Sequence, residues 1–64
     1  MTKAEAIEAM KTHRVRHRYF SEGEWVTQCT NGLYCFEDGT YCTPEEFWEC
    51  RTLSMWEDGW EIVD

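Results

Sequence analysis

Hydrophobic positions in the first eleven residues recur with the period of a helix. Ile7 and Met10 fall on one face, and Thr2 and Glu5 have the spacing of a helix capping box, in which each residue satisfies a backbone N–H of the other. Alanines with high helix propensity occupy several of the remaining positions. We therefore expect a short helix at this end of the chain that covers the core.

The period changes to two between residues 14 and 20, where charged residues alternate with Val15, His17 and Tyr19. This alternation is typical of a strand with one face toward the core. We expect Val15, His17 and Tyr19 to point inward. Residues 21–24 contain Gly23 and are expected to form the turn that follows the strand.

Two glycine-containing dipeptides then predict two tight hairpins. Asn31-Gly32 separates a strand over residues 25–30 from one over residues 33–37, and Asp38-Gly39 returns the chain through residues 40–42. With two-residue turns, the facing pairs are Thr27 and Phe36, Cys29 and Tyr34, Phe36 and Tyr41, and Cys35 and Cys42. This register predicts one aromatic face made of Trp25, Thr27, Cys29, Tyr34 and Phe36.

A second helix is predicted from the sequence Thr43-Pro44-Glu45-Glu46. It combines a capping threonine, a proline at the first helical position and a glutamate three residues after the cap. The helix should run to about residue 51, before a loop over residues 52–59 and a last strand over residues 60–63. We predict a single α+β domain over residues 1–64, with an N-terminal helix, a small antiparallel sheet of four to five strands and a second short helix before the last strand.

The core of so short a chain is small, because its 64 residues include two Ile, two Leu and three Val against ten aromatic residues. Such domains usually need disulfides, a metal or a partner subunit. The four cysteines contain no C-x-x-C pair, and His13 and His17 would lie roughly 13 Å apart on a strand, so no metal site is expected. No signal peptide or membrane span is indicated, and in the cytoplasm the cysteines should remain thiols. We therefore expect a homo-oligomer, either a dimer or a larger assembly.

Positive charge is concentrated in one segment. The net charge is −7, yet residues 11–18, KTHRVRHR, hold four of the six basic residues and no acid. Arg14, Arg16 and Arg18 project to one side of an extended strand and offer forked donors to phosphate or carboxylate oxygens. Balancing acids across strands or between subunits is an equally good use of these arginines. A long nucleic acid is not expected as a partner, because the net negative charge repels an extended polyanion.

Catalytic signatures are missing from the sequence, which has no glycine-rich phosphate loop, no nucleophile elbow and no H-E-x-x-H. We expect neither enzymatic activity nor a cofactor. The four tryptophans suit either core packing or stacking on a base. Packing fits Trp48 and Trp60 best, whereas Trp25 and Trp56 lie beside turns, at positions suited to the border of a pocket for a small nucleotide.

Five segments follow one another in this chain: MTKAEAIEAMK, RVRHRYFSEGEWV, the GLYCFEDG hairpin, TPEEFW and WEDGWEIV. In this order they resemble small phage proteins related to the Thoeris anti-defence 2 family. The resemblance implies a compact α+β domain that forms a homo-oligomer in the cytoplasm of the infected host. It also implies a sponge that sequesters a nucleotide-derived immune signal, of the ADP-ribose type or a cyclic nucleotide, without cleaving it.

Six residues are the candidates for contacting such a ligand. Arg16 and Arg18 would hold phosphate, Tyr19 and Trp25 would contact a base or ribose, and Trp56 and Asp58 would close the site, since a carboxylate suits ribose hydroxyls. The competing interpretation for each is packing or surface ion pairing. For the protein as a whole, the alternative function is an acidic protein that inhibits a host protein by direct binding or by mimicry of nucleic acid.

Overall fold

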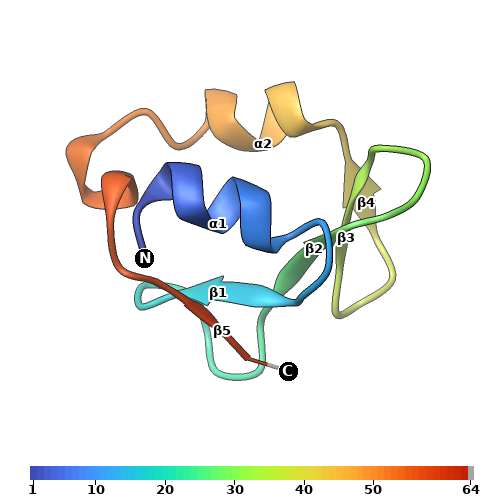
Figure 1. Cartoon of the computed structure of the whole chain (residues 1–64), viewed down its shortest axis with the longest axis horizontal. Helices are drawn as coiled ribbons and strands as arrows, with labels where there is room; N and C mark the ends of the chain where they lie inside the picture. Colours follow the sequence, from blue (N-terminus) through green and yellow to red (C-terminus); the bar gives the residue numbers. More distant parts are fainter. Residues whose placement is uncertain (64) are drawn as a thin grey trace.

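The computed structural model describes residues 1–63, which form two α-helices, a short 3₁₀ helix and a five-stranded sheet (Figure 1). In chain order the elements are α1 (Lys3–Ala9), β1 (Val15–His17), β2 (Val26–Gln28), β3 (Tyr34–Phe36), β4 (Tyr41–Cys42), α2 (Pro44–Glu49), η1 (Ser54–Glu57) and β5 (Trp60–Ile62). This confirms the predicted α+β class, with a second short helix before the last strand. No helix in residues 1–63 is long and apolar enough to cross a membrane.

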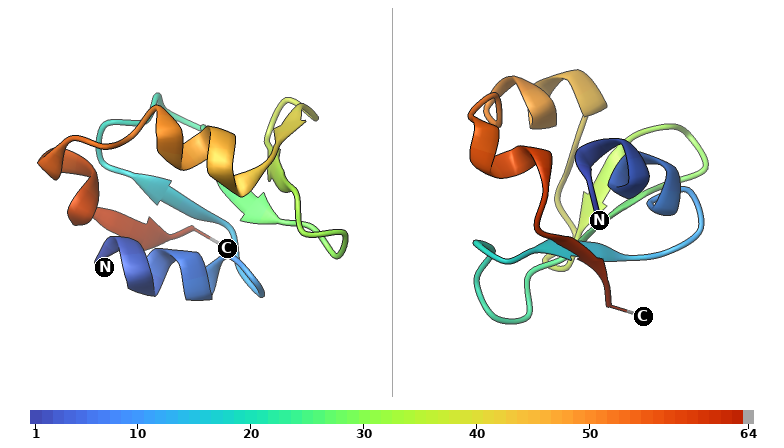
Figure 2. Two further views of the ribbon diagram at one scale, coloured as in Figure 1. Left: turned by 90° about the horizontal axis from the view of Figure 1, so that it is seen from above. Right: turned by 60° about the vertical axis from the view of Figure 1, so that its left-hand side comes forward.

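All neighbouring strands are antiparallel, in the order β4-β3-β2-β1-β5, so the last strand joins the sheet beside the first. Both helices lie on the same side of this sheet (Figures 1 and 2). The N-terminus lies against the outer edge of β5, where Met1 and Trp60 exchange backbone hydrogen bonds of 2.6 and 3.2 Å. The first residue therefore lies beside the start of the last strand.

Both helices begin where the capping signals predicted. The Thr2 hydroxyl accepts from the Glu5 N–H at 3.2 Å, and the Glu5 carboxylate accepts from the Thr2 N–H at 2.8 Å. Thr43 and Glu46 repeat this box at α2. The hydrogen bonds from Thr2 and Thr43 hold the pKa of Glu5 and of Glu46 below its ordinary value. Both helices are shorter than predicted, since α1 ends at residue 9 and α2 at residue 49.

The two hairpin turns contain three residues each, and the prediction of two-residue turns was wrong. The N–H of Cys29 donates to the carbonyl of Leu33 at 2.8 Å, and that of Gly32 donates to the carbonyl of Cys29 at 2.9 Å. Gly32 has a φ of 88°, the left-handed conformation that closes a three-residue loop. The same arrangement recurs over residues 37–39, where Gly39 has a φ of 86°.

The longer turns shift both predicted registers by one residue. The observed pairs are Val26 with Phe36, Thr27 with Cys35, Gln28 with Tyr34, Tyr34 with Cys42 and Cys35 with Tyr41. Because side chains alternate along a strand, a shift of one residue exchanges the two faces of the hairpin. Tyr34 and Phe36 therefore share the core face with Val26, and the predicted face that joined them to Thr27 and Cys29 was wrong.

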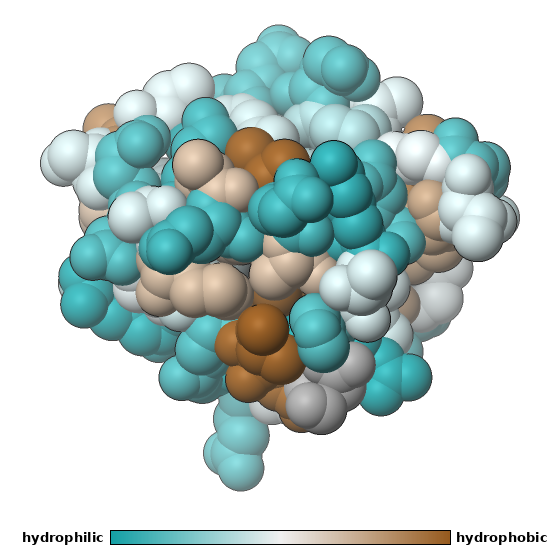
Figure 3. Space-filling model, viewed as in Figure 1, coloured by the Kyte–Doolittle hydropathy of each residue, from teal (hydrophilic) through white to brown (hydrophobic). Residues whose placement is uncertain are grey.

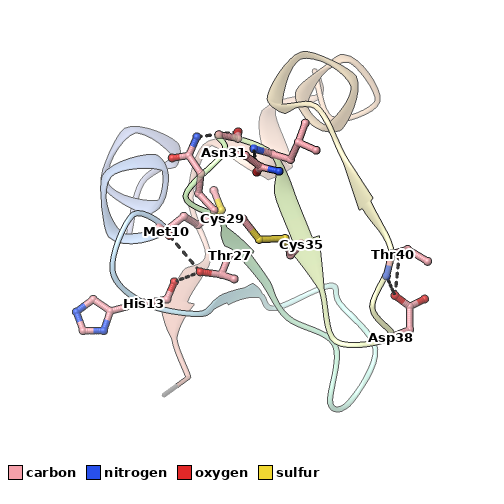
Figure 4. The surroundings of a disulfide bond; sticks show 11 residues. Met10, His13, Thr27, Cys29, Asn31, Cys35, Asp38 and Thr40 are labelled. Atoms are coloured by element: carbon pink, nitrogen blue, oxygen red, sulfur yellow. Dashed lines mark hydrogen bonds between the residues drawn. A yellow bond between two sulfur atoms is a disulfide. The ribbon is translucent and has the colours of Figure 1, made fainter.

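A disulfide joins Cys29 to Cys35 across the β2–β3 hairpin (Figure 4), so the expectation that all four cysteines are thiols was wrong. The corrected register explains the bond, because it places both side chains on the same face with their Cα atoms 6.4 Å apart, within disulfide range. Cys42 lies opposite Tyr34 and is a free thiol, as is the exposed Cys50. Since disulfides are typical of oxidising compartments, the cytoplasmic location stays a prediction.

The core lies between the helices and the sheet. Its buried hydrophobic side chains are Ala6, Met10, Val15, Phe20, Val26, Tyr34, Phe47 and Trp60. Helix α2 is attached mainly through aromatic contacts: the rings of Phe47 and Tyr34 lie edge-on with centroids 5.2 Å apart, and the indole N–H of Trp48 donates to the Tyr34 hydroxyl at 3.0 Å. Aromatic residues therefore supply most of the buried volume, as the shortage of aliphatic residues indicated.

Val15 and His17 point into the core as predicted, but Tyr19 does not and is 60% exposed. Strand β1 ends at His17, and the N–H of Phe20 donates to the His17 carbonyl at 2.9 Å. This turn breaks the alternation after His17. Phe20 then takes the core position that the pattern assigned to Tyr19.

Candidate functional site

A groove of about 750 Å³ lies beside the turn between β1 and β2 and next to the end of β5. It is lined by Arg14, Arg16, Phe20, Glu22, Gly23, Glu24, Trp25 and Val63. Ile62 and Val63 are 44% and 41% exposed. Figure 3 shows hydrophobic surface on the face of the molecule that it draws. A groove of this volume is within the usual range for small-molecule sites.

Arg16 is anchored at the groove by two hydrogen bonds. Its Nη1 donates to the Glu61 carboxylate at 3.0 Å, and its Nη2 donates to the Phe20 carbonyl at 3.3 Å. Glu61 is the residue directly opposite Arg16 in the β1–β5 register, so the sheet itself sets up this pair. The two bonds use two of the five N–H donors of the guanidinium group.

Arg14 lies over the ring of Trp25, with the guanidinium carbon 4.7 Å from the ring centroid. Both residues line the groove. Arg14 and Arg16 flank the buried Val15, so the alternation of the strand turns both arginines away from the core. Arg14 belongs to the basic segment but is not among the six candidate contact residues. Its spacing of two from Arg16 puts both side chains on the same face of the strand, and this spacing could have predicted its place in the groove.

The turn before β2 brings two carboxylates to the groove. Glu24 donates its N–H to the Ser21 carbonyl at 3.0 Å, and its side chain accepts from the Ser21 N–H at 2.9 Å. Gly23 has a φ of 82°, which fits the third position of a type II turn. Glu22 and Glu24 both line the groove, and the sequence analysis did not identify either residue.

Of the six predicted contact residues, the groove lining includes Arg16 and Trp25. The other four are Arg18, Tyr19, Trp56 and Asp58, and none of them is part of the groove. The guanidinium carbon of Arg18 lies 5.4 Å from the Tyr19 ring centroid. Asp58 lies 3.7 Å from the N-terminal ammonium group, and the half-buried Trp56 packs on the core. The structure therefore does not gather the six residues into one site.

His17 is fully buried and fastens the loop before β5 to β1. Its Nε2 lies 2.7 Å from the Asp58 carbonyl and 3.0 Å from the Met55 carbonyl, and its Nδ1 lies 3.1 Å from the Tyr19 nitrogen. Carbonyls only accept and a backbone N–H only donates, so these contacts suit the tautomer that carries its proton on Nε2. This role needed contacts some forty residues away in the sequence and could not be predicted from the alternation alone.

The chemistry available at the groove is binding by charge, hydrogen bonds and ring contact. The free thiol of Cys42 lies outside it, and burial, followed by the charge of Glu46, raises the pKa of Cys42, which keeps this thiol protonated and weakly nucleophilic. In residues 1–63, no group of three or more His, Cys, Asp or Glu side chains is placed to hold a metal ion.

Comparison with protein-family models, with curated proteins and with solved structures finds no match to this chain.

Proposed function

We propose that this protein binds a small nucleotide-derived phosphate ester in the groove and holds it without turnover. In this proposal it is a phage anti-defence sponge whose ligand is an immune signal of the ADP-ribose type or a cyclic nucleotide, in the cytoplasm of the infected host. The observation that carries the proposal is the groove lined by Arg14, Arg16 and Trp25, in which Arg14 lies over the Trp25 ring. Guanidinium groups suit phosphate, and an indole ring suits a base.

The ion pair between Arg16 and Glu61 should not prevent phosphate binding, because it contributes less free energy than hydrogen bonds to a phosphate would. The Arg16 side chain is 27% exposed and that of Glu61 is 60% exposed, and a pair with this much solvent contact contributes only about 0–1 kcal/mol. Hydrogen bonds from a guanidinium group to a phosphate contribute roughly 1.5–3 kcal/mol. A ligand phosphate should therefore recruit Arg16 and leave Glu61 to solvent.

The strong negative charge of the whole protein is compatible with an anionic ligand at this position. At physiological ionic strength, charges farther apart than about 8 Å are largely screened from one another. The arginines that line the groove therefore act on a bound phosphate more strongly than the distant acids do. The same net charge still disfavours a long nucleic acid, which would extend across the acidic surface.

The lining of the groove supports sequestration over catalysis. Among the described residues of the lining there is no serine, threonine, cysteine, lysine or histidine, and Glu22 and Glu24 are the side chains there that could act as proton carriers or nucleophiles. Sequestration requires only affinity, which a groove with forked donors and an aromatic ring supplies. A homo-oligomer is part of the same proposal, because a second subunit would enclose a ligand that one open groove leaves partly exposed.

Titration calorimetry with ADP-ribose and with cyclic nucleotides tests the proposal, together with chromatography of ligand released by heat. We expect binding below millimolar concentration and recovery of the ligand unchanged. Recovery of an altered ligand would make the protein an enzyme. If no nucleotide binds and a host protein does, the acidic inhibitor is the correct function and the sponge is not.

A further inference from the structure

The groove holds acids as well as arginines, and its lining has no net formal charge. Glu22 and Glu24, from the turn before β2, line the groove together with Arg14 and Arg16. Bare phosphate or pyrophosphate would meet two guanidinium groups but also two carboxylates, which repel it. A ligand that suits this lining must offer hydrogen-bond donors to the carboxylates while it offers phosphate oxygens to the arginines.

The ribose of a nucleotide provides such donors close to its phosphate. Its 2′- and 3′-hydroxyls can both donate to one carboxylate, and dinucleotide-binding folds use an acidic side chain for this purpose. One ligand can therefore satisfy both kinds of charge in the groove. A nucleotide without these hydroxyls would leave a carboxylate beside the sugar without a donor from the ligand.

Of the two acids, Glu22 is the better placed to contact a sugar. Glu24 already accepts the Ser21 N–H at 2.9 Å, which commits one of its carboxylate oxygens to the turn. Glu22 is exposed and occupies the second position of the same turn. Next to it, Gly23 has no atom within 4 Å of the position that a Cβ would take, so the turn leaves open space beside Glu22.

We propose that Glu22 selects ligands with an intact ribose diol, so that the groove prefers ribonucleotides both to dideoxynucleotides and to simple phosphates. This inference rests on the proposed function, since it assigns a ligand class to the same groove. It goes beyond that function because neither affinity for phosphate nor stacking on a ring distinguishes one sugar from another.

Calorimetry with ADP, 2′,3′-dideoxy-ADP and pyrophosphate tests the selection in the wild-type protein. We expect ADP to bind at least about tenfold more tightly than its dideoxy analogue. A ratio of this size is expected when a ligand loses hydrogen bonds to a charged group. Glu22→Gln should weaken ADP, bring the two nucleotides within about threefold of each other and strengthen pyrophosphate, because one repelling charge is removed. Glu57→Gln removes the same charge from an exposed residue outside the groove and should change none of the three affinities by more than about twofold.

The outcomes separate this inference from the proposed function. Equal affinity of the wild-type protein for ADP and dideoxy-ADP would overturn the role of Glu22 and leave nucleotide binding intact. The same conclusion follows if Glu22→Gln keeps the wild-type preference, or if ADP-ribose binds and ADP does not. If ADP-ribose, the cyclic nucleotides, ADP and pyrophosphate all fail to bind, the proposed function itself is wrong. Circular dichroism of each variant confirms that the fold is retained.

Discussion

Replacement of Gly59 by alanine should destabilise the protein more than the same change at Gly39. Both glycines have left-handed backbone angles, with φ of 92° and 86°. A Cβ at Gly59 would lie 3.0 Å from Nε2 of His17 and 3.1 Å from Nε of Arg18, whereas a Cβ at Gly39 would meet no atom within 4 Å. The comparison therefore separates the packing around His17 from the backbone conformation.

The expected magnitudes follow from these two contributions. An alanine in the left-handed conformation costs about 1–2 kcal/mol, and both variants lose this amount. Overpacking costs a further 1–3 kcal/mol or so, and it applies only at position 59. The ring of His17 cannot move away easily, because hydrogen bonds hold it at both nitrogens. The Gly59→Ala variant should therefore lose about 2–5 kcal/mol of unfolding free energy, and Gly39→Ala only the backbone contribution of about 1–2 kcal/mol.

Urea unfolding followed by circular dichroism measures both losses, with thermal unfolding as a second readout. A domain of this size loses roughly 4–8 °C of Tm for each kcal/mol, so a difference of about 1–3 kcal/mol should separate the two variants by about 4–24 °C. Equal losses, within about 0.5 kcal/mol, would refute the tight packing between Gly59 and His17. Gly23→Ala is a second control, because its φ of 82° and open surroundings match those of Gly39.

Three further predictions concern the disulfide, the helix caps and assembly. Replacing Cys29 and Cys35 together by alanine should lower the unfolding free energy by about 2 kcal/mol, the entropy of closing so short a loop; an unchanged urea midpoint would contradict the bond. Hydrogen bonds from Thr43 hold the pKa of Glu46 below 4.5, so this carboxylate adds stability above that pH and loses it as the pH falls through its folded pKa. Glu46→Gln should therefore flatten the acid side of the stability profile, and a parallel profile would show that the cap has no such role. Light scattering should give a dimer or larger mass, because the small core leaves Leu53, Ile62 and Val63 exposed, and a monomer at micromolar concentration would contradict it.

Local signals in the sequence were sufficient to predict the two helices and the succession of strands along the chain, but not the pairing of β5 with β1. The capping boxes of Thr2 and Thr43 involve residues only three positions apart, so their hydrogen bonds can be predicted from the sequence. The turns were harder, because Asn31-Gly32 fits either a two-residue or a three-residue loop. The choice depends on how the strands twist and pack, and it decided both the register and the disulfide.

The groove could not be predicted in full from the sequence, because it is formed by residues from segments that are distant along the chain. Arg16 and Trp25 were identified because a basic strand and an aromatic residue beside a turn are local features. Glu22 and Glu24 looked like ordinary solvated turn residues, and only the folded structure shows that they line the same groove as Arg14 and Arg16. Trp56 and Asp58 also lie beside a turn, but His17 ties that loop to the core face of β1, whereas Arg14 and Arg16 line the groove from the other face.

The central claim is that a nucleotide binds in the groove, and calorimetric titration of ADP-ribose into two arginine variants tests it most directly. Arg16 lines the groove, whereas Arg18, two residues away on the same segment and with the same charge, does not. We predict that Arg16→Ala loses about 1.5–3 kcal/mol of binding free energy, that Arg16→Lys recovers only part of it, and that Arg18→Ala stays within about 0.5 kcal/mol of the wild-type protein. Equal losses in Arg16→Ala and Arg18→Ala, or no loss in either, would contradict the assignment of the ligand to this groove.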